Sequence, residues 1–142
     1  MAFNYKKDNQ NIVTVTMDMI GRTTNVINEE FFKLWSDTVE RLESEKDLSG
    51  VILTSAKKTF LAGGDLEMIF KLNDSKYTFE IIEKLKAKQR RLEILNKPVV
   101  AAINGTALGG GLEMALCCNY RVVLNDSNIK FGFPEVNFGI MP

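Results

Sequence analysis

Two short apolar runs, each followed by a glycine-rich turn, restrict the fold of this chain more than any other feature. Residues 50–54 and 98–103 are mostly apolar and rich in β-branched side chains, which is typical of strands buried inside a sheet. Glycine-rich turns follow at residues 62–65 and 109–111, and each turn precedes a stretch with helical character. Such strand-turn-helix units indicate an α/β fold.

The remaining elements fit the same architecture. Strands are predicted at residues 3–7, 12–17, 50–54, 98–103, 120–124 and 129–131. Helices are predicted from Asn28, a plausible N-cap, from near Gly64, over residues 75–95 before Pro98, and after the triple glycine. The first two strands form a hairpin across the turn at residues 8–11. Neither a linker nor an internal repeat interrupts this order, which predicts one domain.

Composition excludes several classes of function. The 142 residues are 45% hydrophobic and 25% charged, a profile of a single globular domain with enough chain for a core. Eighteen basic residues balance eighteen acidic ones, so no overall positive field favours nucleic acid. The chain has no histidine, which removes the usual general base and the commonest zinc ligand. Chemistry at neutral pH is therefore left to carboxylates, lysines and backbone dipoles.

The cysteines and the hydropathy pattern suggest a reducing compartment. Cys117 and Cys118 are adjacent in an apolar stretch, where a bridge between them is improbable and a small-residue core role is expected. Without histidine or spaced cysteine pairs, no metal site is expected. The first residues lack a signal-peptide pattern, and no apolar run is long enough for a membrane span. We therefore expect a cytoplasmic protein.

The two glycine-rich turns suggest a site for a developing negative charge. Glycine lets backbone N–H groups approach a ligand closely, and a helix N-terminus adds positive potential. If the turns face one point, the amides of Gly64 and Gly110 form an oxyanion hole. Alternatively, the glycines serve only tight turns and close packing. Their spacing matches neither a P-loop nor a dinucleotide-binding motif.

Glu113 and Glu135 are the candidate acid and base. Glu113 follows the triple glycine in the first turn of a helix, where the dipole favours its charged form. Glu135 lies in the apolar stretch 131–138, which disfavours a charge on its carboxyl. Different environments are how two carboxyls acquire opposite roles in one pocket. A helix cap at Glu113 and an exposed carboxylate at Glu135 are the alternatives, and a separation of 22 residues does not show that they meet.

Basic residues offer a possible contact for a phosphate-rich ligand. Lys57 and Lys58 precede the first glycine-rich turn. A second basic stretch at residues 84–91 has Glu80, Glu83 and Glu93 on either side of it, which is typical of a solvated helix face.

Three segments in order resemble the enoyl-CoA hydratase/isomerase (crotonase) family. They are residues 60–66, residues 107–115, and residues 131–136 with 139–142. Within the family, residues 119–121 and 139–142 are most similar to the N-terminal hydratase portion of multifunctional fatty-acid oxidation α subunits. The resemblance implies a crotonase-like (ClpP/crotonase) spiral of ββα units, with residues 1–142 as the N-terminal part of a domain cut before its C-terminal helices.

The resemblance also implies residue roles. It places oxyanion amides at Gly64 and Gly110 and catalytic carboxyls at Glu113 and Glu135. It suggests substrate contacts at Ala62, Asp65, Leu66, Lys57 and Lys58. The implied reaction adds water to trans-2-enoyl-CoA, giving 3-hydroxyacyl-CoA, with no metal and no cofactor beyond the CoA thioester of the substrate.

Two other functions remain open. One is a Δ3-Δ2 enoyl-CoA isomerase or another CoA-thioester enzyme using the same site. The other is a CoA-binding or assembly module without turnover. The resemblance further implies a larger parent protein with 3-hydroxyacyl-CoA dehydrogenase activity, acting as a homo-oligomer or in a complex with a thiolase subunit.

Overall fold

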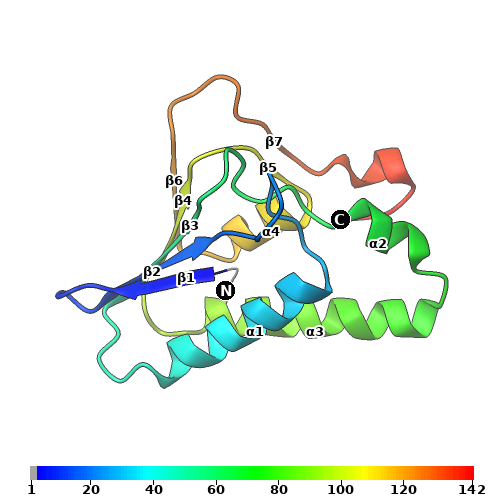
Figure 1. Ribbon diagram of the computed structural model, residues 1–142. Helices are drawn as coiled ribbons and strands as arrows, with labels where there is room; N and C mark the ends of the chain where they lie inside the picture. The colour runs from blue at the N-terminus through cyan, green and yellow to red at the C-terminus, as the bar shows by residue number, and fades with distance from the viewer. Residues whose placement is uncertain (1–2) are drawn as a thin grey trace.

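A five-stranded sheet forms the centre of the computed structural model, which describes residues 3–142 (Figure 1). Its strand order is β1-β2-β3-β4-β6. The strands are β1 (Phe3–Lys7), β2 (Ile12–Met17), β3 (Gly50–Ser55), β4 (Val99–Ile103) and β6 (Tyr120–Val123). β1 and β2 form the predicted antiparallel hairpin, and the other neighbours pair in parallel. The α/β prediction is therefore confirmed.

Two long helices, α1 (Glu29–Ser44) and α3 (Ser75–Glu93), lie side by side below the sheet in Figure 1. The side chain of Asn28 accepts a hydrogen bond from the Phe31 amide at 2.9 Å, which confirms the predicted N-cap. Asp74 caps α3 in the same way. The shorter helices are α2 (Leu66–Lys71) and α4 (Gly110–Leu116). Among the described residues, no helix is long and apolar enough to cross a bilayer.

The core lies between one face of the sheet and the two long helices. Alternate strand residues, such as Val51 and Leu53 on β3, are buried together with Phe31 and Trp35 of α1. Ile52 on the opposite face of the same strand is half-buried. The prediction of a buried strand is therefore confirmed at Val51 and Leu53, because the helical layer packs against the face that carries them.

A second, two-stranded sheet positions the C-terminal motif. It pairs β5 (Ala107–Leu108) in parallel with β7 (Phe131–Gly132). β5 was not predicted, because two residues carry no periodicity. A short 3-10 helix, η1 (Pro134–Phe138), follows β7 and lies beside α2 (Figure 1). This arrangement brings the segment 131–136 against the first glycine-rich turn, residues 62–65.

Candidate active site

The two glycine-rich turns lie against each other. The Leu108 amide donates a hydrogen bond to the Leu61 carbonyl at 3.2 Å, and Leu61 forms a bridge with Ala107. Gly63 has φ +87°, and a Cβ added there would lie 2.8 Å from the Leu108 carbonyl oxygen. Only glycine combines this dihedral angle with so close a backbone approach. Segments 44 or more residues apart in sequence are thereby joined.

Ile27, in the loop before α1, contacts both turns. Its amide donates to the Gly63 carbonyl at 2.8 Å, and its carbonyl accepts from the Asp65 amide at 2.9 Å. Its Cδ1 atom lies 2.8 Å from the position that a Cβ on Gly110 would take. Within residues 3–142, the amides of Gly64 and Gly110 donate no hydrogen bond to another protein group. Ile27 thus pairs with the backbone on both sides of Gly64, and its side chain packs against Gly110.

A small cavity of about 60 Å³ lies where these elements meet. Its walls come from the first turn, α2, Gly109 and η1. The lining residues are Ala62, Gly63, Gly64, Leu66, Ile69, Gly109, Pro134, Glu135, Phe138 and Ile140. Gly110 and Glu113 are not among them, so the cavity coincides with only part of the predicted site.

Glu135 reaches from η1 to the triple glycine. One carboxylate oxygen, Oε1, lies 2.5 Å from the position that a Cβ on Gly109 would occupy. The other, Oε2, is buried and has no hydrogen-bond partner among the described residues. Buried polar atoms in proteins are nearly always paired, so an unpaired carboxylate oxygen is typical of a functional position. The alternative of a freely exposed carboxylate at Glu135 is wrong.

Glu113 lies in the first turn of α4, with its amide donating to the Gly109 carbonyl at 3.0 Å. Burial raises the pKa of the Glu113 carboxyl, and the negative charge of Glu135 raises it further. The expectation that the helix dipole would favour the charged form is therefore wrong. α4 has only seven residues and Glu113 is half-buried, so lost hydration outweighs the dipole. The Glu113 Oε2 atom lies 3.6 Å from the position that a Cβ on Gly110 would take, so the two carboxylates lie against adjacent glycines.

The other predicted contacts divide into two groups. Ala62 and Leu66 line the cavity. The Asp65 carboxylate instead caps α2 through the Glu67 amide and pairs with Arg22 at 3.0 Å. Lys57 pairs with Asp18 at 2.6 Å, and Lys58 is exposed. The structure therefore does not gather Asp65, Lys57 and Lys58 at the cavity.

Sequence reasoning missed Ile27 as part of this site and named Gly109 only as a member of the triple glycine. Gly109 carried a signal, since it belongs to the triple glycine and has φ +51°. Ile27 carried none, because a single apolar residue in a loop has no pattern. Within residues 3–142, no group of three or more His, Cys, Asp or Glu side chains could hold a metal ion.

Comparison with known proteins places these features in a family. A family model described as enoyl-CoA hydratase/isomerase matches residues 7–142. The chain is 37% identical to the fatty acid oxidation complex subunit alpha of Idiomarina loihiensis, with 99% of this chain and 20% of that protein covered. The corresponding subunit of Shewanella oneidensis is 36% identical over the same shares. The chain therefore spans about a fifth of the length of these relatives.

Solved structures agree on the fold. An enoyl-CoA hydratase from Bacillus anthracis superposes with a TM-score of 0.87 at 25% identity, covering 100% of this chain and 54% of that one. An enoyl-CoA hydratase from Thermoplasma volcanium gives a TM-score of 0.87 at 26% identity, covering 99% and 54%. The fold is thus the crotonase fold, and the chain belongs to the enoyl-CoA hydratase/isomerase family.

Proposed function

We propose that this chain carries the site of an enoyl-CoA hydratase of fatty-acid β-oxidation, which adds water to a trans-2-enoyl-CoA. The main support is geometric: a Glu135 carboxylate oxygen lies 2.5 Å from the position of a Cβ added to Gly109, and a Glu113 carboxylate oxygen lies 3.6 Å from that of a Cβ added to Gly110. Hydration needs two proton movements, one from the water and one to the substrate, and two adjacent carboxyls can serve both. The names of the relatives and of the matched structures fit this reaction.

In this proposal, the backbone stabilises the charge that develops during the reaction. The amides of Gly64 and Gly110, which have no protein acceptor among the described residues, donate hydrogen bonds to the thioester carbonyl. That oxygen gains negative charge as water attacks C3. Backbone donors held in place by the fold lower the barrier without reorganisation. Ala62 and Leu66 hold the substrate from the wall of the cavity.

The carboxyls divide the proton transfers between them. Glu113 orients the water and accepts its proton as the oxygen bonds to C3, and Glu135 supplies a proton to C2. A raised pKa makes the Glu113 carboxylate the stronger base. The proton that Glu113 takes from the water balances the proton that Glu135 gives to C2, and transfer of a proton from Glu113 to Glu135 restores the pair for the next cycle. Hydration by this route requires no metal and no cofactor besides the CoA thioester of the substrate.

The relatives suggest a larger context. The chain covers about a fifth of each. We propose that residues 1–142 are the N-terminal part of a hydratase domain within a longer protein. That protein would also carry 3-hydroxyacyl-CoA dehydrogenase activity and associate with copies of itself or with a thiolase subunit. Lys57 and Lys58 would approach the phosphates of CoA, and Lys57 would then exchange its contact with Asp18 for the ligand.

The test measures how fast the protein at its full natural length removes the absorbance of crotonyl-CoA. Glu113→Gln and Glu135→Gln are each expected to lower kcat by about 10²-fold or more, the usual contribution of a general acid or base. Glu67→Gln is the matched control and should retain activity, because Glu67 is a carboxylate on α2 that does not line the cavity.

The outcomes separate the candidate functions. Activity retained in both variants would refute the two-carboxylate mechanism. Conversion of a 3-enoyl-CoA without hydration of crotonyl-CoA would indicate the isomerase instead. Binding of an acyl-CoA without turnover of either substrate would indicate a binding or assembly module.

A further inference from the structure

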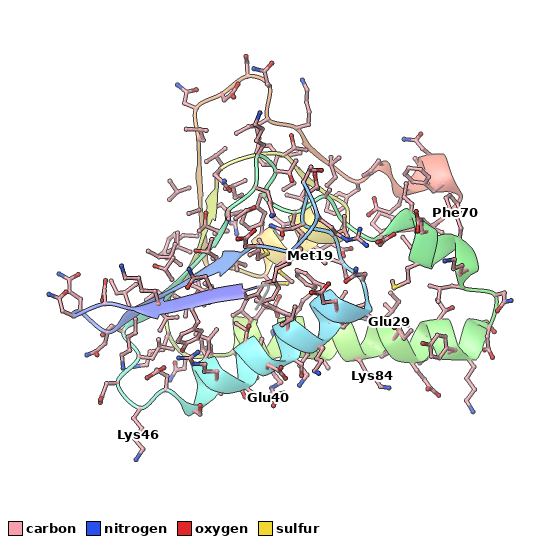
Figure 2. All side chains as sticks on the ribbon, viewed as in Figure 1. Met19, Glu29, Glu40, Lys46, Phe70 and Lys84 are labelled. Carbon is pink, nitrogen blue, oxygen red and sulfur yellow. The ribbon has the colours of Figure 1, made fainter. Side chains whose placement is uncertain are left out.

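A cavity of about 380 Å³ lies between α1 and α3, away from the residues of the candidate active site. The two helices run in parallel, and ion pairs join their C-terminal halves. Lys88 pairs with Glu40 at 2.8 Å, and Arg91 pairs with Glu43. The cavity opens between the N-terminal halves. Figure 2 labels Glu29 and Lys84, which border it from the two helices.

The walls of this cavity are apolar. Phe32 and Trp35 of α1 face Ile81 and Leu85 of α3 across it. Its volume falls within the range of about 300–1,000 Å³ that is typical of small-molecule sites. Trp35 is 1% exposed, and its indole N–H has no hydrogen-bond partner among the described residues.

The rim of the cavity is predominantly cationic. Lys33 and Lys84 are exposed and form no ion pair with another residue in the described part of the chain. Lys88 also lines the cavity, but it is held by Glu40. Among the lining residues, Glu29 is the one carboxylate beside these three lysine ammonium groups. An apolar interior with a positive rim complements a ligand with an aliphatic tail and an anionic head.

We propose that the α1–α3 cavity is a second binding site, which takes an aliphatic carboxylate with its tail between the helices and its head at Lys33 and Lys84. The tail would contact Phe32, Ile81 and Leu85 and would be buried there, away from water. Burial of methylene groups then supplies most of the affinity, and the lysines select the sign of the head group. This site is separate from the one proposed for the CoA thioester and does not depend on that function.

Isothermal titration calorimetry of the protein at its full natural length measures the binding. Decanoate and decylammonium are titrated below their aggregation concentrations. Decanoate should produce a saturable change and bind at least about tenfold more tightly than decylammonium. From octanoate to decanoate, the affinity should rise by up to about fourfold per methylene. Equal affinity for both head-group charges, or no saturable change, overturns the proposal.

Variants locate the bound molecule. Lys33→Gln and Lys84→Gln should each weaken decanoate binding about threefold or more, and Ile81→Phe, which fills the cavity, should weaken it further. Lys86→Gln is the matched control, because Lys86 lies on the same helix but pairs with Glu83 and does not line the cavity. Far-UV circular dichroism checks that each variant folds.

Binding at the other site would give a different pattern. If Glu135→Gln weakens decanoate binding while Lys84→Gln does not, the carboxylate occupies the candidate active site and the proposal is wrong. If Lys86→Gln weakens binding as much as Lys84→Gln, the head group responds only to the general charge of α3, which also contradicts the site.

Discussion

The Glu135 carboxylate occupies the space left by the missing side chain of Gly109. Its Oε1 atom lies 2.5 Å from the position of an added Cβ, closer than real Cβ contacts. Gly109 also has φ +51°, which side-chain-bearing residues rarely adopt. The triple glycine and the segment 131–136 are therefore matched in shape at Gly109 and Glu135.

Gly109→Ala should displace Glu135 and strain the backbone. We expect a loss of about 1–3 kcal/mol in the free energy of unfolding, from the unfavourable dihedral angle, and a fall in kcat with it. Gly21→Ala is the control, because Gly21 has φ +72° but no atom within 4 Å of an added Cβ. Urea denaturation and a crotonyl-CoA assay measure both effects. Equal loss of activity in the two variants would show that strain, and not the position of Glu135, is responsible.

Glu113→Gln should stabilise the protein at neutral pH while it lowers activity. The pKa of Glu113 is raised in the folded state from 4.5, so the folded protein binds more protons than the unfolded chain above that pH. This contribution to stability is complete below about pH 4.5 and is lost as the pH rises through the folded pKa. The variant should remove that decline, which thermal unfolding between pH 4 and 8 can measure. Glu83→Gln, on the exposed face of α3, should leave the decline in place.

Asp65 is expected to act on α2 and not on the substrate. Its Oδ1 accepts from the Glu67 amide at 3.0 Å, and its Oδ2 pairs with Arg22. Asp65→Ala should cost about 1 kcal/mol in unfolding free energy, the usual effect of losing an N-cap. Asp65→Asn keeps a capping oxygen and should cost less, with KM unchanged. A raised KM in the asparagine variant, at unchanged stability, would instead support the substrate contact.

The adjacent cysteines should be nearly inert in the folded protein. Burial raises the pKa of both the Cys117 and Cys118 thiols to about 12. Because the thiolate is the reactive form, alkylation by iodoacetamide at pH 8 should be about 10³-fold slower than for a free thiol. Mass spectrometry of protein labelled with and without urea compares the two states. The same shift predicts that stability declines as the pH rises above about 8.5 toward 12, and Cys118→Ala should reduce the decline.

Local patterns predicted most of the elements. The alternation in β1 and β2, the cap at Asn28 and the spacing of Phe31 and Trp35 all record interactions between residues near in sequence. The ends were less certain, since α3 stops at Glu93 and not at residue 95. β5 was missed because its two residues are held by pairing with β7, a partner far along the chain.

The candidate site shows the same division. The sequence by itself determined which residues can carry the chemistry: two glutamates, flexible glycine-rich turns, and no histidine. Tertiary structure alone decided that Glu135 fits against Gly109, that Asp65 caps α2, and that burial raises the pKa of Glu113. Chemical type is a local property of the chain. Proximity and hydration depend on which distant segments pack together, and no pattern within one segment records that.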